Sequence, residues 1–581
     1  AHVEGKKRRR VWIDSQTEEE ILRGIREAKD LSEYDNLGAS AYLRAKEDYL
    51  MGINFSRLLT LKYGNSISNF LQTKYSVISV GRVMTCVLGM VVRREREIRD
   101  FVKTPFYRVL STIDAQGHTF EGEWRAVKGS RYFESYDLYK ENGFKERKKA
   151  EELIQYLQTP DDESVNVAGI QRQLGLNCRI ESIEKKKEKK NPPLLYNLAE
   201  LQNVCSKLFK ISPDETLSIV QDLYEKKLVT YPRTDARVLS TAVAKEIYKN
   251  ISGLRNYPQA GEAAQGALEL GAYKNIAKTR YTNDKQITDH YAIIPTGQGL
   301  GALKGLSLTA QRVYETIVRR FLSIFYPPAV YQKVSLVTKM ENESFFSSFK
   351  VLLSEGYLKI AANSFAKKSM AEASGKTPES EGEGEVSCDE ALLAALQKLK
   401  KGDILNINGL GIKEGETSPP KRYNSGSMIL AMENAGQLIE DEELRAQIKG
   451  SGIGTSATRA EILKKLVNIK YLALNKKTQV ITPTLQGEMI YDVVDHSIRS
   501  LLNPELTASW EKGLNYVAEG SITSDEYMRK LDHFITSRTV GVKGLNNQYQ
   551  LRACYEKAAG FYPSVNNNKT IGRTKTGNKS K

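Results

Sequence analysis

The ten residues Leu228–Arg237, LVTYPRTDAR, are the stretch from which the rest of the chain can be interpreted. Pro232 disfavours helical backbone for the residue before it, so Tyr231 is expected on an extended segment, where alternate side chains share a face. Tyr231, Arg233 and Asp235 are therefore predicted to point the same way. A phenol beside a guanidinium suits attack on a phosphodiester, because arginine binds two phosphate oxygens with a planar fork of donors and a phenolate can form an ester with phosphorus.

Taken alone, a tyrosine before a proline in a β-rich segment is more often a packing residue than a nucleophile. The wider pattern, Tyr-x-Arg-Thr-Asp after an apolar dipeptide, resembles the active-site signature of the type IA DNA topoisomerases, and Thr-Tyr-Pro-Arg-Thr-Asp is closest to the topoisomerase III branch. The resemblance implies that Tyr231 is the nucleophile, that Arg233 is catalytic and that Asp235 belongs to the DNA-binding site. Ala236 departs from the family, which usually has serine there.

The composition indicates a basic, globular protein of several domains. The chain has 581 residues, 40% of them apolar, which is enough for three to five domains with real cores. Lys and Arg outnumber Asp and Glu by 86 to 70, a surplus typical of proteins that bind a polyanion, nucleic acid foremost. The alternative is that this charge only keeps the protein soluble.

Several classes of protein are disfavoured by the same sequence. It has no apolar run of about 18 residues and no apolar stretch behind its basic N-terminus, so neither a membrane span nor a signal peptide is predicted. Its five cysteines include no Cys-x-x-Cys, which argues against a disulfide framework and a zinc ribbon and fits the predicted location in a reducing cytoplasm. The Ser374–Thr377 segment resembles the end of a phosphate loop, but Met370 stands where that loop needs glycine, so no ATP site is predicted.

Changes in hydrophobic period divide the chain. Residues 17–103 have a helical pattern that opens with a capping box at Thr17 and Glu20, and a period of two begins at about Phe106. Pro-Pro pairs at 192–193, 327–328 and 419–420 mark joints between segments of different character. We predict a helical DNA-binding domain in two parts (1–104 and 419–540), a β arch in two parts (105–193 and 328–418), a helical domain carrying Tyr231 (194–327) and a basic flexible tail (541–581).

Some local elements can be predicted in more detail. Ser212 is a helix N-cap followed by Pro213 at the first helical position, and Leu217, Val220 and Leu223 follow as a buried stripe. A further helix is predicted over 145–157. The lysine-rich run 183–190 is interpreted as a solvated edge or linker, and residues 366–387, small and charged, as a mobile surface loop.

Further motifs resemble the same family in the same order along the chain. Ser79–Thr85, SVGRVMT, contains a glycine turn that lets backbone approach a phosphate beside Arg82, and the upstream helix carries Arg44 and Arg57. The resemblance implies that these three arginines bind single-stranded DNA. Met84 stands where the family usually has glutamine.

Two more motifs complete the predicted site. His290, in DHYAIIPT, resembles the histidine near the cleaved phosphate, where imidazole could donate to the phosphate or shuttle a proton. The sequence GIGTSATRAE at 452–461 places glycines before a helix start with a predicted capping box of Thr458 and Glu461, an arrangement that exposes backbone N–H groups to an anion. Here the resemblance assigns DNA binding to Thr455 and Arg459.

The family also carries a Toprim domain, with a general-acid glutamate and an Asp-x-Asp-x-Glu cluster for magnesium, and this sequence contains no Asp-x-Asp. Mg²⁺ is therefore implied by the resemblance alone, and no metal ligand is assigned. The chain begins with Ala1 rather than methionine, so we expect its natural start to lie upstream. As given, it is expected to be an incomplete piece that binds DNA without turnover.

Three functions compete at this point. The first is an ATP-independent type IA topoisomerase, a multidomain α+β protein with the family's toroidal core, that cleaves one strand through a 5′-phosphotyrosyl link, passes a strand and religates, so relaxing or decatenating DNA. The second is a clamp that binds single-stranded DNA without chemistry. The third, a relaxase-type nuclease, is disfavoured because the five histidines include no His-x-His pair.

Overall fold

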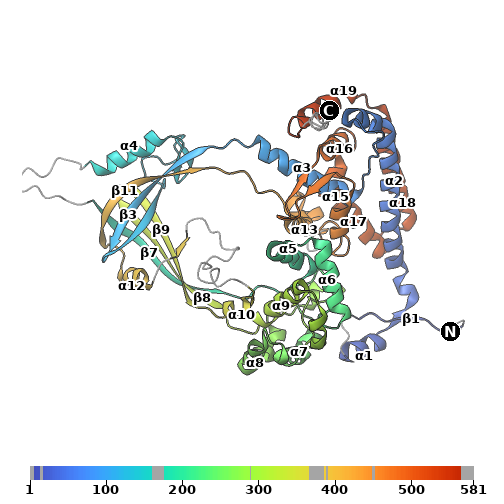
Figure 1. The fold of residues 1–581 in the computed structure, drawn as a ribbon, viewed down its shortest axis with the longest axis horizontal. Helices are drawn as coiled ribbons and strands as arrows, with labels where there is room; N and C mark the ends of the chain where they lie inside the picture. The colour runs from blue at the N-terminus through green and yellow to red at the C-terminus, as the bar shows by residue number, and fades with distance from the viewer. Residues whose placement is uncertain are drawn as a thin grey trace, which may run out of the picture.

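A computed structural model describes residues 5–13, 18–159, 176–287, 289–365, 385–387, 390–447 and 452–563. These residues form three bodies, each with its own buried core: a helical body, a β arch and a second helical body that carries Tyr231, here called the tyrosine body (Figure 1). The chain runs from the helical body through the arch to the tyrosine body, then back through the arch to the helical body. Helix and sheet are thus combined in one multidomain α+β molecule.

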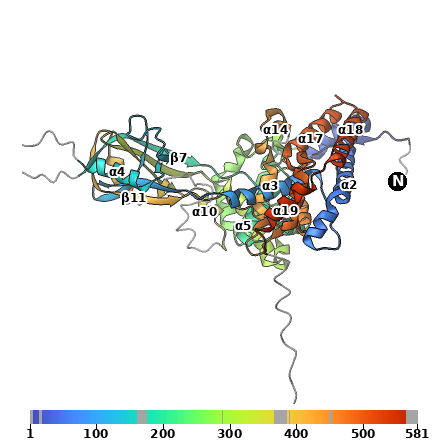
Figure 2. The same ribbon diagram turned by 90° about the horizontal axis from the view of Figure 1, so that it is seen from above.

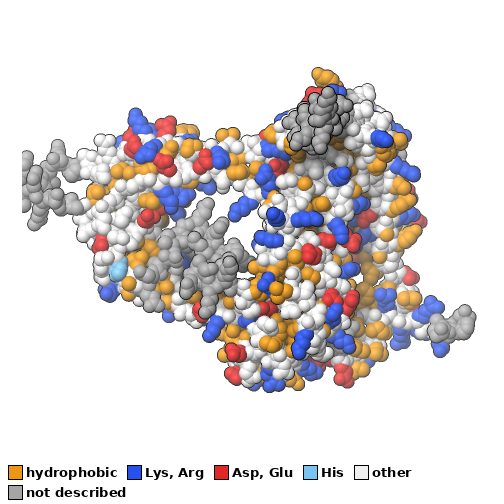
Figure 3. All heavy atoms as spheres, in the orientation of Figure 1, with side chains coloured by type: hydrophobic (Ala, Val, Ile, Leu, Met, Phe, Trp, Pro, Cys, Tyr) orange, Lys and Arg blue, Asp and Glu red, His pale blue; other side chains and the backbone are white. Residues whose placement is uncertain are grey.

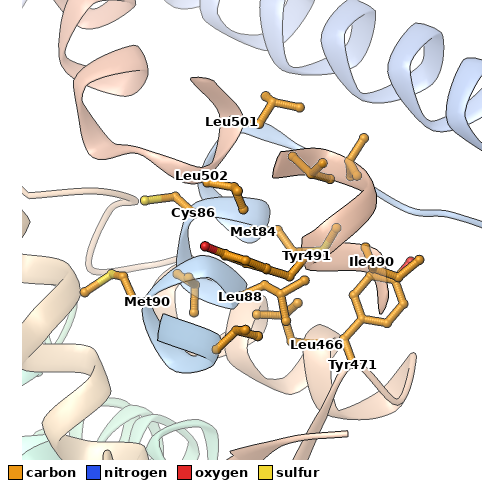
Figure 4. Close-up of a cluster of buried hydrophobic side chains, with 14 of the residues drawn as sticks. Met84, Cys86, Leu88, Met90, Leu466, Tyr471, Ile490, Tyr491, Leu501 and Leu502 are labelled. Atoms are coloured by element: carbon orange, nitrogen blue, oxygen red, sulfur yellow. The ribbon is translucent and has the colours of Figure 1, made fainter. Parts of the chain in front are cut away.

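The helical body joins the first hundred residues to the last part of the described chain. Its main helices are α2 (Asp35–Leu71), α3 (Arg82–Asp100), α13 (Ser425–Glu433), α15 (Arg459–Asn468), α16 (Leu485–Asp495), α17 (Pro504–Ala518) and α18 (Ser524–Gly544). The apolar side of α3 is central: Cys86 and Leu88 are buried against Leu466, Leu501 and other side chains from the C-terminal segment (Figure 4). The helical pattern predicted for the N-terminal segment is confirmed, although Thr17 of its capping box lies outside the described residues.

The end of the chain differs from the prediction of a flexible tail. Residues 548–559 form a helix, α19 (Gln548–Ala559), and Leu551, Tyr555 and Ala558 are buried against the helical body. Their spacing of three and four residues is that of an amphipathic helix, a signal outweighed in the prediction by the excess of Lys and Arg. The prediction is wrong for this helix, and residues 564–581 lie outside the described part.

The arch is a nine-stranded sheet. Its strands are β3 (Pro105–Ala115), β4 (His118–Arg125), β5 (Leu138–Lys140), β6 (Gly143–Phe144), β7 (Asn177–Lys190), β8 (Ala329–Met340), β9 (Glu343–Ser354), β10 (Glu385–Ser387) and β11 (Ile404–Glu416). Because β4 pairs with both β3 and β9, six of these strands form a closed circuit in the order β3, β4, β9, β8, β7, β11. Buried side chains including Val109, Ile113, Trp124 and Phe345 fill it, as the period of two predicts.

Two predictions for the arch need correction. The lysine-rich run is not a linker but the second half of β7, paired with β8 from Arg179 to Lys190. On its other side, β7 pairs with β11 only at residues 177–179. The lysine-rich run 183–190 therefore has a strand neighbour on one side only and is largely exposed, which agrees with the predicted solvated edge. Within the predicted loop 366–387, residues 385–387 form β10, parallel to β9, and 366–384 lie outside the described part. The helix predicted over 145–157 is confirmed as α4 (Arg147–Gln158).

The tyrosine body is built mainly from α5 (Leu198–Phe209), α6 (Pro213–Glu225), α7 (Thr241–Gly253), α8 (Gly261–Leu270) and α9 (Leu308–Ser323). The predicted cap is confirmed, because the Ser212 hydroxyl accepts a hydrogen bond from the backbone N–H of Glu215 and Pro213 opens α6. Val220 and Leu223 are fully buried and Leu217 partly so. Helix α6 leads directly into the Tyr231 stretch.

The three bodies close into a ring (Figure 1). The chain itself joins the arch to each helical part, whereas the tyrosine body and the helical body meet through side chains, with α5 packed on α13. Seen from above, the arch extends to one side of the helical parts (Figure 2). On the face in Figure 3, Lys and Arg side chains gather along the margin between arch and helical body. No helix in the described ranges combines the length and apolar character needed to cross a membrane.

Candidate active site

Two segments far apart in sequence place Tyr231 beside His290. Backbone Val229 pairs with Pro295, the Thr230 hydroxyl donates to the Ala292 carbonyl at 3.0 Å, and the Thr234 hydroxyl donates to the His290 carbonyl at 2.7 Å. Both threonines of the motif therefore hold the backbone of the histidine segment through hydrogen bonds.

Exposure along the motif alternates as extended backbone requires. Pro232 and Thr234 are buried, whereas Tyr231 and Asp235 are half-buried and Arg233 is exposed. The predicted shared face for the odd-numbered side chains agrees with this alternation.

Tyr231 lies in an aromatic corner of the tyrosine body. Its ring centroid is 4.4 Å from that of His290, with the planes tilted by 48°, and 5.4 Å from that of Tyr224, which meets it edge-on. A groove of about 620 Å³ opens at this corner, and its lining includes Lys227 and Thr296. An imidazole this close to a phenol can exchange a proton with it or with a group bound beside it.

Sequence reasoning missed Tyr224. It belongs to α6, seven residues before Tyr231, where the apolar spacing of the helix drew attention to Leu223 instead. The signal that could have identified it is position: a helix that ends directly before the motif must place its last turn next to the nucleophile.

Asp235 and Arg459 connect the tyrosine body to the helical body. Arg459 Nη1 lies 3.0 Å from Asp235 Oδ1, and only 1% of the Arg459 side chain is exposed. Asn197 reinforces this contact, because its amide donates to the Asp235 carbonyl at 3.1 Å and to Glu433 Oε1 at 2.5 Å. Burial raises the pKa of the Glu433 carboxyl. In this structure Arg459 thus pairs with a carboxylate, and its contact with DNA stays a prediction.

The predicted capping box at the start of α15 is wrong. Thr458 occupies the N-cap position but makes no side-chain cap; its hydroxyl instead accepts from the backbone N–H of Thr455 at 3.1 Å. The preceding turn brings Thr455 and Thr458 together, so the hydroxyl is satisfied before the helix starts. Positive φ at Gly452 and Gly454, +65° and +69°, explains the glycines of this turn.

A second groove, of about 840 Å³, gathers three of the predicted DNA-binding residues. Arg44 from α2, Arg82 from α3 and Thr455 from the turn before α15 all line it, together with Lys465. Arg57 does not line it; it is exposed on α2 thirteen residues beyond Arg44, about 20 Å along the helix. The Asp235–Arg459 ion pair lies close in sequence to both grooves: Asp235 is four residues after Tyr231 of the first groove, and Arg459 directly follows Thr458, which lines the second.

The charges in this second groove are largely paired within the protein. Arg82 is buried and contacts Glu47, Asp48 and Glu511 at 3.3, 3.1 and 3.0 Å, and Arg44 lies 2.5 Å from Glu511. A phosphate in this groove would therefore compete with carboxylates for both arginines.

A metal ion would need several ligating side chains close together. Among the described residues, no group of three or more His, Cys, Asp or Glu side chains is placed to hold one. The magnesium implied by the resemblance therefore finds no fitting ligand set in these ranges.

Comparison with known proteins gives one consistent result. The model of a family described as DNA topoisomerase matches residues 32–529. DNA topoisomerase 3 of Bacillus licheniformis is 31% identical over 546 residues, 93% of this chain and 66% of the relative, and that of Bacillus subtilis is 30% identical with the same coverage. The chain thus spans just under two thirds of these relatives. Full-length topoisomerase I from Thermotoga maritima has a similar fold, with a TM-score of 0.57 and 21% identity over 91% of this chain and 73% of that one.

Proposed function

Because the chain belongs to the DNA topoisomerase family, in its type IA, topoisomerase III-like branch, we propose that it cleaves and rejoins one strand of DNA through Tyr231 without ATP. The observation that carries the proposal is the placement of Tyr231 in a groove, with its ring centroid 4.4 Å from that of His290 and with Asp235 of the same stretch paired with Arg459 of the helical body. A packing tyrosine would not need a groove, an imidazole and an exposed arginine on its own stretch.

The proposed chemistry is a reversible phosphoryl transfer. The Tyr231 oxygen attacks phosphorus and loses its proton, the P–O3′ bond breaks, and the leaving 3′ oxygen takes up a proton. The strand end is held as a 5′-phosphotyrosyl ester, so the energy of the bond is kept and reversal reseals the strand. Arg233 would bind the phosphate oxygens, and His290 would contact the scissile phosphate or move a proton. Magnesium has no fitting ligand set in the described residues, so no step is assigned to it.

Strand passage is proposed to use the joint between tyrosine body and helical body. No chain connection crosses this joint, because every covalent link between the two runs through the arch. The ring would therefore open without a break in the chain if α5 separated from α13 and the ion pairs across the joint, such as Arg459–Asp235 and Lys464–Asp214, were released. The arch would keep the parts together. The excess of Lys and Arg, a net charge of +16, favours a nucleic acid inside such a ring.

The test is covalent capture of a single-stranded oligonucleotide. The relatives extend beyond the matched region, so both this chain and the full product of its gene, here called the complete protein, are incubated with labelled oligonucleotide, denatured and separated on a gel. We expect the complete protein to form an adduct that Tyr231→Phe abolishes, with little change in affinity for the oligonucleotide. Tyr224→Phe is the matched control, since this ring lies in the same groove, and it should retain the adduct.

The possible outcomes distinguish the proposed topoisomerase from the non-catalytic clamp. An adduct that survives Tyr231→Phe would refute the assignment of the nucleophile. Tight binding by the complete protein without any adduct would favour the non-catalytic clamp.

A further inference from the structure

Behind the second groove lies a carboxylate that the proposed chemistry does not use. Glu47, on α2, is 0% exposed. The Tyr527 hydroxyl, from α18, donates to its Oε2 at 2.6 Å, whereas Oε1 has no hydrogen-bond partner and lies 3.3 Å from Arg82 Nε. A buried carboxylate oxygen without a hydrogen bond is costly, so this group has a reason to bind a proton.

Arg82 connects this buried carboxylate to the groove. Its Nε contacts Glu47 and Asp48, and its Nη1 contacts Glu511 at 3.0 Å. In the described part of the chain, the hydrogen bonds and ion pairs of Arg82 use these two nitrogens, which leaves Nη2 for a group bound in the groove that Arg82 lines. A phosphate there would share one guanidinium with three carboxylates.

The charges around Glu47 come from four helices. Helix α2 contributes Asp48 and Arg44, α3 contributes Arg82, and α17 contributes Glu511. Helix α18 contributes the neutral phenol of Tyr527, which hydrogen-bonds to Glu47. Burial raises the pKa of the Glu47 carboxyl to about 7, and Asp48 and Glu511 act in the same direction, while Arg82 and the Tyr527 hydrogen bond oppose the rise. None of the residues that line the groove is histidine.

We propose that Glu47 is a positioning residue for Arg82 and that it takes up a proton when a DNA phosphate binds in the second groove. The inference rests on the proposed function, because it takes single-stranded DNA as the ligand. Glu47 would touch no DNA itself, but its charge would set how strongly Arg82 is held by the protein instead of by the DNA phosphate.

The direction of the coupling follows from the charges. A bound phosphate adds negative charge near Glu47 and draws the guanidinium toward itself, and both changes make the ionised form of Glu47 less favourable. Protonation of Glu47 in turn removes one of the three carboxylates that compete for Arg82. DNA binding and proton uptake therefore favour each other, and the coupling is reciprocal. Affinity should be higher at pH 6.5 than at pH 8.5, by up to about tenfold per pH unit for one proton.

The test measures proton uptake directly. The 581-residue chain is titrated with oligothymidine, whose bases do not titrate in this range, between pH 6.5 and 8.5 at constant ionic strength. Fluorescence anisotropy gives the affinity, and calorimetry in two buffers of different ionisation enthalpy gives the number of protons taken up. Glu47→Gln, which is permanently neutral at this position, should bind oligothymidine at pH 8.5 as tightly as the unchanged chain does at pH 6.5. Its binding should also take up fewer protons than binding by the unchanged chain does at the same pH.

Two further variants keep the test decisive if Glu47→Gln folds poorly. Asp48→Asn is the matched control, because Asp48 contacts the same Arg82 nitrogen but its side chain is 51% exposed; it should retain proton uptake. Tyr527→Phe removes a hydrogen bond that favours the charged carboxylate, so the pH midpoint of affinity should move upward. A role for Glu47 in packing alone would produce neither pattern.

Proton uptake that is absent, or unchanged in Glu47→Gln, would overturn the inference while leaving covalent capture through Tyr231 intact. A chain that binds no oligothymidine at any of these pH values would overturn both the inference and the DNA-binding part of the proposed function.

Discussion

Arg233 is the residue whose role depends most on its chemistry rather than on its charge. It is exposed two residues after Tyr231, although it does not line the Tyr231 groove, so its fork of donors is available to a phosphate whose charge is redistributed during transfer. Arg233→Lys keeps the charge but loses the fork. We expect single-turnover cleavage by the complete protein to slow by about tenfold or more, towards the roughly 100–1000-fold that one lost transition-state donor costs, with little change in the Kd for single-stranded DNA. Equal losses in rate and affinity would instead show that Arg233 only anchors the strand.

At the same scale, the sequence predicted which motifs come together better than it predicted the partners of individual side chains. Tyr231 and His290 could be paired because each belongs to a specific motif. The partners of Arg82 and Arg459 could not be foreseen, because Glu511 and Asp235 are 429 and 224 positions away. Both arginines were predicted as phosphate contacts from local patterns, and in the folded chain both are buried and paired with carboxylates.

At the scale of elements, the sequence predicted correctly the features that depend on residues close together in the chain. The cap at Ser212 and the alternation in β3 depend on neighbours in sequence, and both are present in the structure. The errors concern long-range pairing. Strand β7 contains five lysines after residue 184 and forms only because β8 supplies a full-length partner. Likewise α19 is stabilised because Leu551 and Tyr555 are buried in a core that also contains residues as distant in sequence as Met51. The number of charged residues along the tail could not reveal this packing.

At the scale of the whole molecule, the proposed gate can be locked. Ser206 on α5 and Ser425 at the start of α13 are buried, and their hydroxyl oxygens are 3.1 Å apart across the joint. Cysteines at both positions would be close enough for a disulfide. In the complete protein we expect oxidised Ser206→Cys/Ser425→Cys to form the covalent adduct with single-stranded DNA but to stop relaxing supercoiled plasmid, and dithiothreitol to restore relaxation.

The single-cysteine variants control for the substitutions themselves and should relax plasmid under oxidising conditions. If the fully cross-linked protein still passes strands at the normal rate, the ring opens elsewhere, and the joint between α5 and α13 is structural only.

The claim on which the account depends is that Tyr231 carries the 5′ end of the broken strand, and mass spectrometry of the trapped complex tests it most directly. Oligonucleotide is trapped on the complete protein, the complex is digested with nuclease and trypsin, and the modified peptide is sequenced. We predict one modified residue, Tyr231, joined to a nucleotide through its 5′ phosphate, and no modification on Tyr224 in the same groove. Attachment to any other residue, or through a 3′ phosphate, would contradict the account.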